Sequence, residues 1–215
     1  MFYLKWLAIA GYFSFLLIVV TSFNIYLKRK TGEAIFGTFD AKRIPKRLIW
    51  IFVLGMIGTF IVFTYPIIYL FYPQFIETTF PFSPLQNMVV ETLGIVLIVL
   101  GSILMLIAMF QLGLSARLLL PKQKTELITA GVYGFCRNPV YVGIYLSFMG
   151  IFFILPTLVF LIGFFFFLLN NHFRILEEEK FLTDAFGQEY VKYCQSVGRY
   201  WPKIRGKSII KEDIV

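Results

Sequence analysis

The chain has 215 residues, of which 59% are hydrophobic and 26 are phenylalanine. A soluble domain contains roughly 45–50% apolar residues, so this composition excludes an ordinary water-soluble fold. The net charge of +8 does not indicate a nucleic-acid partner, because the basic residues flank apolar stretches instead of forming one patch.

Three long apolar stretches come first along the chain, at residues 2–27, 48–71 and 88–112. Each is close to the roughly 20 residues that a helix needs to cross a bilayer, and the first is too long for the apolar core of a signal peptide, so we expect three retained spans. The loop at 28–47 is rich in Lys and Arg, whereas the loop at 72–87 has neither. By the positive-inside rule the first loop is predicted to be cytoplasmic and the second to lie outside.

The next apolar segment, Val140 to Asn171, would be about 48 Å long as one helix, which exceeds a hydrocarbon core of roughly 30 Å. Pro156 lies near its middle and lacks a backbone N–H donor. We therefore predict two helices that form a hairpin bending around residues 155–157. The hairpin returns the chain to the side of the first loop, so the basic tail from Arg174 onward is predicted to be cytoplasmic.

The tail is predicted to be helical to about Phe186, to stop at Gly187, and to form a second short helix over residues 188–197. The expected fold class is therefore all-α: a polytopic membrane bundle of about five transmembrane helices, with a helical hairpin and a cytoplasmic helical tail. We divide the chain into an N-terminal three-span region, residues 1–112, and a catalytic region, residues 113–215.

Polar side chains gather in two clusters, one at each end of the hairpin, at residues 131–143 and 170–179. Because a hairpin brings its ends together, we expect the clusters to face each other. Arg137 in the first cluster suits a carboxylate or phosphate. Glu178 and Glu179 in the second could bind an ammonium or sulfonium cation. A zwitterion that carries a cationic sulfur, as S-adenosylmethionine does, would match both clusters.

Each candidate also has a simpler interpretation. Arg137 could anchor a helix to lipid phosphates. Arg174 and Glu178 could form an i,i+4 pair worth a few tenths of a kcal/mol on a solvated helix face. His172, the only histidine, could deprotonate an amine or thiol, although a lone interfacial histidine is more often only hydrogen-bonded. The two cysteines are far apart and lack metal-ligand spacing, so no metal site is predicted.

Several motifs resemble those of the isoprenylcysteine carboxyl methyltransferases and related phospholipid methyltransferase-like membrane enzymes. The family pattern Gly-x-Tyr followed by Arg-His-Pro-x-Tyr-x-Gly is similar to the stretch from Gly131 to Gly143, except that Asn138 replaces the His. Later family motifs are similar to Glu178-Glu179, Phe186-Gly187-Gln188-Glu189-Tyr190 with Tyr193, and Val197-Gly198-Arg199-Tyr200-Trp201-Pro202. The resemblance covers residues 112–202.

The resemblance implies an integral membrane methyltransferase that uses S-adenosyl-L-methionine. Its acceptor would be lipophilic or amphipathic, either an isoprenylcysteine-like carboxylate or a phospholipid-like amine, reached from the bilayer at the cytoplasmic membrane face. The residues carried over as cofactor-binding are Tyr133, Arg137, Asn138, Pro139, Tyr141, Arg174, Glu178 and Glu179. We assign catalysis to Arg137, His172 and Glu178.

Two alternatives differ from this interpretation. A membrane reductase of the sterol type, using NADPH, has a similar C-terminal region, but its signature belongs to a longer chain with more spans and needs more basic residues for the extra phosphates. A non-enzymatic scaffold or transporter subunit would have no reason to pair Arg-Asn-Pro with Glu-Glu across a hairpin. The sequence leaves the identity of the acceptor and the oligomeric state open.

Overall fold

The computed structural model describes residues 2–31, 49–113 and 127–203. Within these ranges the chain is helical and forms no β-strand, which confirms the predicted all-α class. Most of the basic first loop, residues 32–47, and the chain after residue 203 lie outside them. The elements, in chain order, are α1 (Phe2–Thr31), α2 (Ile49–Phe71), α3 (Pro73–Thr78), the 3₁₀ turn η3 (Ser83–Leu85), α4 (Met88–Leu112), the 3₁₀ turn η5 (Gly131–Gly134), α5 (Pro139–Ile154), α6 (Leu158–Phe186) and α7 (Gln188–Ser196).

Helices α1, α2, α4 and α6 are long and apolar enough to cross a membrane. α5 has 16 residues and is about 24 Å long, so it is the short member of the bundle. The expected multi-pass membrane bundle is confirmed. The sequence did not predict α3 and η3, which are short helical turns in the loop between α2 and α4.

The predicted hairpin is formed by α5 and α6, with its turn at Leu155 to Thr157. Thr157 caps α6 by accepting a hydrogen bond from the Phe160 N–H. The loop after α3 braces this turn, because Phe82 N–H donates to the Pro156 carbonyl at 2.7 Å. At the other end of α6, Gly187 has φ 57° and ψ −128°, a positive-φ conformation that glycine adopts without a side-chain clash, and α6 ends there as predicted.

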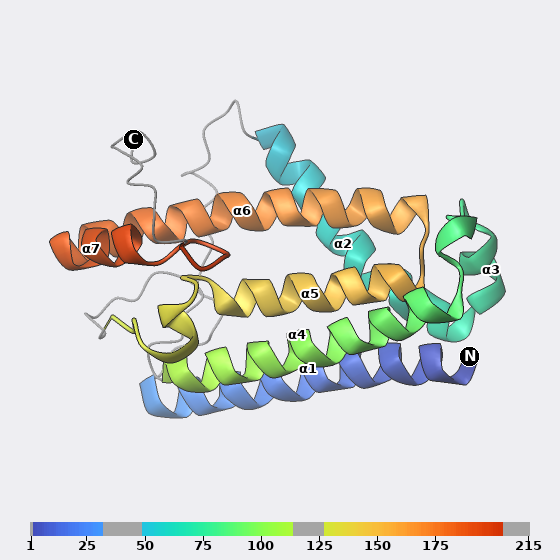
Figure 1. Cartoon of the computed structure of the whole chain (residues 1–215), viewed down its shortest axis with the longest axis horizontal. Helices are drawn as coiled ribbons and strands as arrows, with labels where there is room; N and C mark the ends of the chain where they lie inside the picture. Colours follow the sequence, from blue (N-terminus) through green and yellow to red (C-terminus); the bar gives the residue numbers. More distant parts are fainter. Residues whose placement is uncertain (1, 32–48, 114–126, 204–215) are drawn as a thin grey trace.

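The bundle has two ends that differ in what they contain (Figure 1). The end that we call the α3 end holds the N-terminus of α1, helix α3 and the turn between α5 and α6. The opposite end, the α7 end, holds η5, the start of α5, the last turns of α6, and α7. The two polar clusters of the sequence therefore lie together at the α7 end.

Glycines let two helix pairs approach backbone to backbone. On the α4–α5 pair, a Cβ added to Gly143 would lie 2.7 Å from the Gly101 carbonyl oxygen. On the α2–α6 pair, a Cβ added to Gly58 would lie 2.6 Å from the Gly163 carbonyl oxygen. Small residues are the usual means of close helix packing in membranes, where lipid removes the hydrophobic drive to associate.

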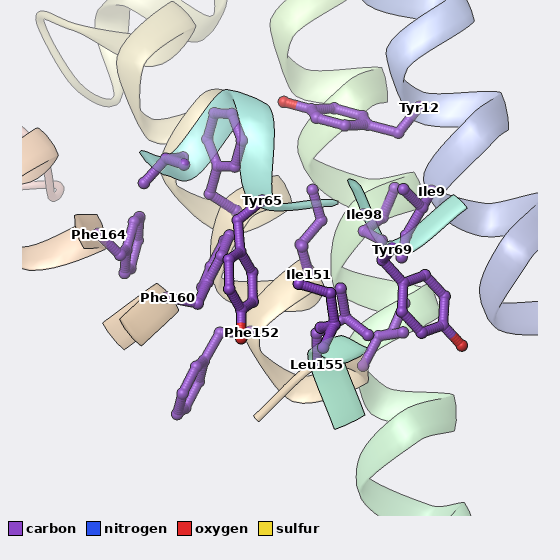
Figure 2. Close-up of a cluster of buried hydrophobic side chains, with 14 of the residues drawn as sticks. Ile9, Tyr12, Tyr65, Tyr69, Ile98, Ile151, Phe152, Leu155, Phe160 and Phe164 are labelled. Atoms are coloured by element: carbon purple, nitrogen blue, oxygen red, sulfur yellow. The ribbon is translucent and has the colours of Figure 1, made fainter. Parts of the chain in front are cut away.

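Aromatic side chains, in contrast, fill the space between α5 and α6. The Phe148 and Phe167 rings lie 5.3 Å apart in an edge-to-face arrangement, a favourable geometry for ring pairs. Figure 2 shows the adjoining core, where Tyr65 of α2 and Phe160 of α6 meet residues of α1, α4 and α5. The two arms of the hairpin are thus held apart by rings and not by direct backbone contact.

Helix α1 is fastened at the α3 end by polar contacts. Lys5 Nζ lies 2.8 Å from a Glu91 carboxylate oxygen on α4 and 3.9 Å from a Glu77 carboxylate oxygen on α3. Trp6 Nε1 donates to the Leu70 carbonyl of α2 at 3.1 Å. One turn of α1 therefore contacts three other helices.

Candidate active site

The chain before α5 is fixed against the end of α4. Gly131 has φ 64°, and the next residue, Val132, donates its N–H to the Gln111 side chain at 2.9 Å. The Tyr133 hydroxyl donates to the Ala108 carbonyl at 3.4 Å. α5 then starts with Pro139 in its first turn, a position where the missing N–H costs no helical hydrogen bond.

The two polar clusters lie close together, as predicted, and Arg137 and Glu179 form a buried ion network with Arg199, which was not predicted. Arg137 Nη2 lies 2.8 Å from Glu179 Oε1, and Arg199 Nη2 lies 2.8 Å from Glu179 Oε2. The Arg137 and Glu179 side chains are only 9% and 12% exposed. Glu179 therefore neutralises one of two arginines, and the hydrogen bonds that it accepts raise the pKa of Arg199.

Arg137 also binds the segment that follows α7. Its Nη1 donates to the Val197 carbonyl at 2.6 Å and to the Cys194 carbonyl at 3.3 Å. Its backbone N–H donates to the Gly198 carbonyl at 2.9 Å. The neighbouring Asn138 donates from Nδ2 to the Arg199 carbonyl at 3.3 Å. Residues 197–199 are thus tied along the chain that enters α5.

A second polar group lies between α5 and α6. The Glu178 carboxylate interacts with the Tyr141 hydroxyl of α5 and with the charge of Arg174, one turn earlier on α6. Tyr141 is buried. This group offers a carboxylate, a phenol and a guanidinium within a small volume, a set of opposite polarities that suits a zwitterion.

An adjoining pocket of about 280 Å³ has mostly apolar walls. Its lining residues are Tyr145, Phe165, Leu168, Leu169, His172 and Tyr200. The Tyr200 hydroxyl and His172 Nδ1 are 2.8 Å apart. Burial raises the pKa of Tyr200 to about 12, and nearby Glu179 adds to this while Arg199 opposes it. The phenol therefore stays protonated at neutral pH and can donate to the imidazole.

The structure places seven of the nine predicted site residues in three locations. Arg137, Asn138 and Glu179 lie in the ion network, Tyr141, Arg174 and Glu178 lie between α5 and α6, and His172 lines the pocket. Tyr133 packs behind the network, where its carbonyl accepts from the Tyr193 hydroxyl at 2.7 Å. Pro139 begins α5.

Sequence reasoning missed three residues of this region. Arg199 was part of a motif, but nothing in the sequence indicated that it shares Glu179 with Arg137. Tyr145 follows Tyr141 by four residues, the spacing that places both on one helix face, and this was the available signal. No spacing pointed to Tyr200, because its position depends on the path of the chain after α7.

Comparison with known proteins gives a consistent picture. The family model for phospholipid methyltransferases matches residues 89–189. The protein-S-isoprenylcysteine O-methyltransferase of Xenopus laevis is 31% identical over 137 residues, which cover 61% of this chain and 47% of that protein. The Saccharomyces cerevisiae protein of the same name is 34% identical over 111 residues, covering 49% of this chain and 46% of that protein.

The fold is similar to a solved structure of the eukaryotic intramembrane Ras methyltransferase, an isoprenylcysteine carboxyl methyltransferase. The TM-score is 0.53 with 23% identity, over 94% of this chain and 69% of that chain. The chain spans about half the length of the curated relatives that it matches. The resemblance predicted from the motifs is confirmed, and it extends into α4.

Proposed function

We propose that this chain, whose motifs and fold are those of the isoprenylcysteine and phospholipid methyltransferase group, is a membrane methyltransferase that depends on S-adenosyl-L-methionine. It acts on a lipophilic or amphipathic acceptor. The observation that carries the proposal is that the two motif clusters meet at the α7 end directly beside an apolar pocket between membrane helices. A polar cofactor and a lipid-like acceptor could therefore bind next to each other.

Glu178, Tyr141 and Arg174 are the residues that would hold the cofactor. Their carboxylate, phenol and guanidinium fit the cationic sulfur and amino group on one hand and the carboxylate of the cofactor on the other. When bound, S-adenosylmethionine supplies an electrophilic methyl group. Pro139 would contribute by starting α5 beside this group.

Arg137, Asn138, Tyr133 and Glu179 would act differently. Arg137 gives its donors to Glu179 and to backbone carbonyls, and both oxygens of Glu179 accept from arginines. We assign these residues to positioning, because they hold residues 197–200 against the start of α5. In this proposal, Arg137 and Glu179 therefore do not touch the cofactor or the acceptor, and they act only by holding other residues in place.

The contribution of the protein to the reaction is alignment and exclusion of water, which together can supply several kcal/mol. A carboxylate acceptor needs no base. An amine or thiol acceptor would need one. His172 is the group in the pocket that could take the proton, at Nε2, in the tautomer whose Nδ1–H donates to the Tyr200 hydroxyl.

The proposal places the α7 end at the cytoplasmic face, because the basic end of α1, with Lys28 and Arg29, and Lys192 of α7 lie there. The division of the chain at residue 112 into a membrane region and a catalytic region also remains a prediction. The sterol-type reductase gains no support from the similarities found, which are all to methyltransferases.

Binding of the cofactor provides the test. We expect calorimetry on detergent-solubilised protein to show binding of S-adenosylmethionine, and Glu178→Gln to abolish it. Glu177→Gln is the matched control, since it makes the same chemical change at the neighbouring position, whose side chain is exposed. A folded wild-type protein that binds NADPH but not S-adenosylmethionine would overturn the proposal in favour of the reductase.

A further inference from the structure

The Tyr145 hydroxyl is buried, yet it reaches no hydrogen-bond partner in the part of the chain that the structure describes. A buried polar group without a partner costs about 1–3 kcal/mol. The side chain is otherwise well packed, with its ring 6.2 Å from the rings of both Phe167 and Tyr200. The protein thus holds a phenol in a fixed place at a cost that packing alone does not explain.

Tyr145 lies between the two functional parts of the site. It lines the apolar pocket, and its hydroxyl is within electrostatic reach of Tyr141, Glu178 and Tyr200. Its ring centroid is 6.3 Å from that of Tyr141, one turn earlier on α5. The contact would therefore be made where the pocket meets the proposed cofactor site.

Two of the other polar atoms of the pocket are already paired with each other. The Tyr200 hydroxyl and His172 Nδ1 bind each other at 2.8 Å. Among the described residues that line the pocket, the Tyr145 hydroxyl is therefore the buried polar group left for a ligand. A phenol can donate to an oxygen or nitrogen lone pair on that ligand.

The remaining walls indicate what kind of ligand this is. Phe165, Leu168 and Leu169 come from α6, and Phe165 is 56% exposed on the surface that faces the bilayer in a membrane-spanning helix. A volume of about 280 Å³ is at the lower limit for a small-molecule site, roughly 300–1,000 Å³. The pocket would hold the polar end of a ligand and the start of its chain, with the rest in lipid.

We propose that Tyr145 is an acceptor-binding residue, whose hydroxyl donates a hydrogen bond to the reacting polar group of a lipophilic acceptor seated against Phe165, Leu168 and Leu169. This inference rests on the proposed function and adds the residue that recognises the acceptor. The His172–Tyr200 pair forms the opposite polar edge of the same pocket and keeps Tyr200 in place.

Tyr145→Phe tests the hydroxyl, with Tyr12→Phe as the matched control. Tyr12 is also a buried tyrosine. Its hydroxyl lies near Ser147 but forms no hydrogen bond of normal geometry with a described residue, and it lies on α1 outside the pocket. The substrates are an S-farnesylcysteine with a free carboxylate and vesicles containing phosphatidylethanolamine. For the acceptor that the wild type methylates, we expect Tyr145→Phe to raise KM about 5- to 10-fold, the loss of one hydrogen bond.

Tyr145→Phe should leave cofactor affinity at the wild-type level and should not lower thermal stability, because it removes a buried hydroxyl that has no partner among the described residues. Tyr12→Phe should likewise not lower thermal stability, and it should change neither KM nor cofactor affinity. Weaker cofactor binding in Tyr145→Phe, with an unchanged KM for the acceptor, would overturn the proposal and assign the hydroxyl to the cofactor. A loss of stability without a change in KM would make its role structural.

A second measurement does not depend on turnover. A photoreactive S-farnesylcysteine analogue should label wild-type protein at the α6 wall of the pocket, and Leu168→Trp should block this labelling by filling the pocket. Leu161→Trp is the control, since Leu161 lies two turns earlier on α6, is exposed and does not line the pocket. Labelling that survives Leu168→Trp overturns the proposal. Labelling of a wild type that transfers no methyl group supports the pocket and contradicts the proposed function.

Discussion

Each end of the bundle contains a buried ion cluster, and the two clusters differ in how many of their carboxylate oxygens have a hydrogen-bond partner. At the α7 end, both oxygens of Glu179 accept hydrogen bonds from Arg137 and Arg199. At the α3 end, Glu91 pairs with Lys5 through one oxygen, and its other oxygen has no partner among the described residues. Removing charges from water is costly unless every group is paired, so the clusters should serve different purposes.

The partners in each cluster explain the difference. Arginine forms a planar fork that binds a carboxylate and leaves further donors for backbone carbonyls, so the α7 cluster fixes the path of a non-helical segment. Lysine has a flexible stem that can move its charge toward water. The α3 cluster therefore joins helices without defining a loop. The cluster in which every carboxylate oxygen is paired is thus the one at the α7 end, where the proposed site needs fixed geometry.

Of the variants that test this comparison, Glu179→Gln should have the largest effect on stability and on cofactor binding. The change leaves two arginines without a counter-charge, and Arg137 is held by backbone carbonyls and cannot move to water. We expect a loss of about 3–5 kcal/mol in the free energy of unfolding and loss of cofactor binding. Unfolding in mixed detergent micelles and calorimetry measure the two. Normal cofactor binding in this variant would show that the network does not position the site.

Glu91→Gln makes the same change at the α3 end and should have a smaller effect. Lys5 loses its nearest partner but can extend toward the membrane surface or toward Glu77. We expect a loss of about 1–3 kcal/mol in the free energy of unfolding, with cofactor affinity unchanged. A loss of cofactor affinity equal to that of Glu179→Gln would remove the distinction between the two ends.

The double variant Lys5→Met with Glu91→Gln sharpens the comparison. Replacing both members of a buried pair by neutral groups removes the cost of burying charge. We expect the free energy of unfolding to return to within about 1 kcal/mol of the wild-type value, measured in the same detergent titration. If the double variant is less stable than Glu91→Gln alone, Lys5 has a role besides pairing with Glu91.

Single neutral hydrogen bonds should have the smallest effects. Trp6→Phe removes the bond to the Leu70 carbonyl at the α3 end, and Asn138→Ala removes the bond to the Arg199 carbonyl at the α7 end. Each should cost about 0.5–1.5 kcal/mol in the free energy of unfolding. Of the two variants, only Asn138→Ala should also lower methyl-transfer activity. The Asn138 bond helps to hold residues 197–199 beside the proposed site, whereas the Trp6 bond lies at the opposite end of the bundle. Equal activity in the two variants would contradict this.

The sequence predicted the helices well where hydrophobic length and a terminating residue agreed. The predicted span 88–112 coincides with α4, and Pro156 and Gly187 mark the turn and the helix end as expected. The short helix α3 and the 3₁₀ turn η3 were missed because they are too short to show a periodic pattern. Elements of this length are defined by tertiary contacts, such as the bond from Phe82 to the Pro156 carbonyl.

The sequence identified the residues of the site better than the contacts between them. That the segments carrying Arg137 and Glu179 lie close together followed from the hairpin alone, but the ion pair between the two side chains was not predicted. The sharing of Glu179 with Arg199 was not predicted either, because it depends on the turn after α7 and on a bond between the Arg137 N–H and the Gly198 carbonyl. Tyr145 stands out because it lines the pocket and its hydroxyl lacks a partner among the described residues, which are properties of the fold and not of a motif.

The path of residues 197–200 has a consequence for biogenesis. These residues are made after every membrane helix of the bundle, yet they supply carbonyls to Arg137 and Asn138 and place Arg199 on Glu179. A ribosome-bound chain could therefore insert and pack α1 to α6 while Glu179 still lacks its second arginine. The order of synthesis would therefore leave the network of Arg137, Glu179 and Arg199 incomplete until the chain after α7 docks.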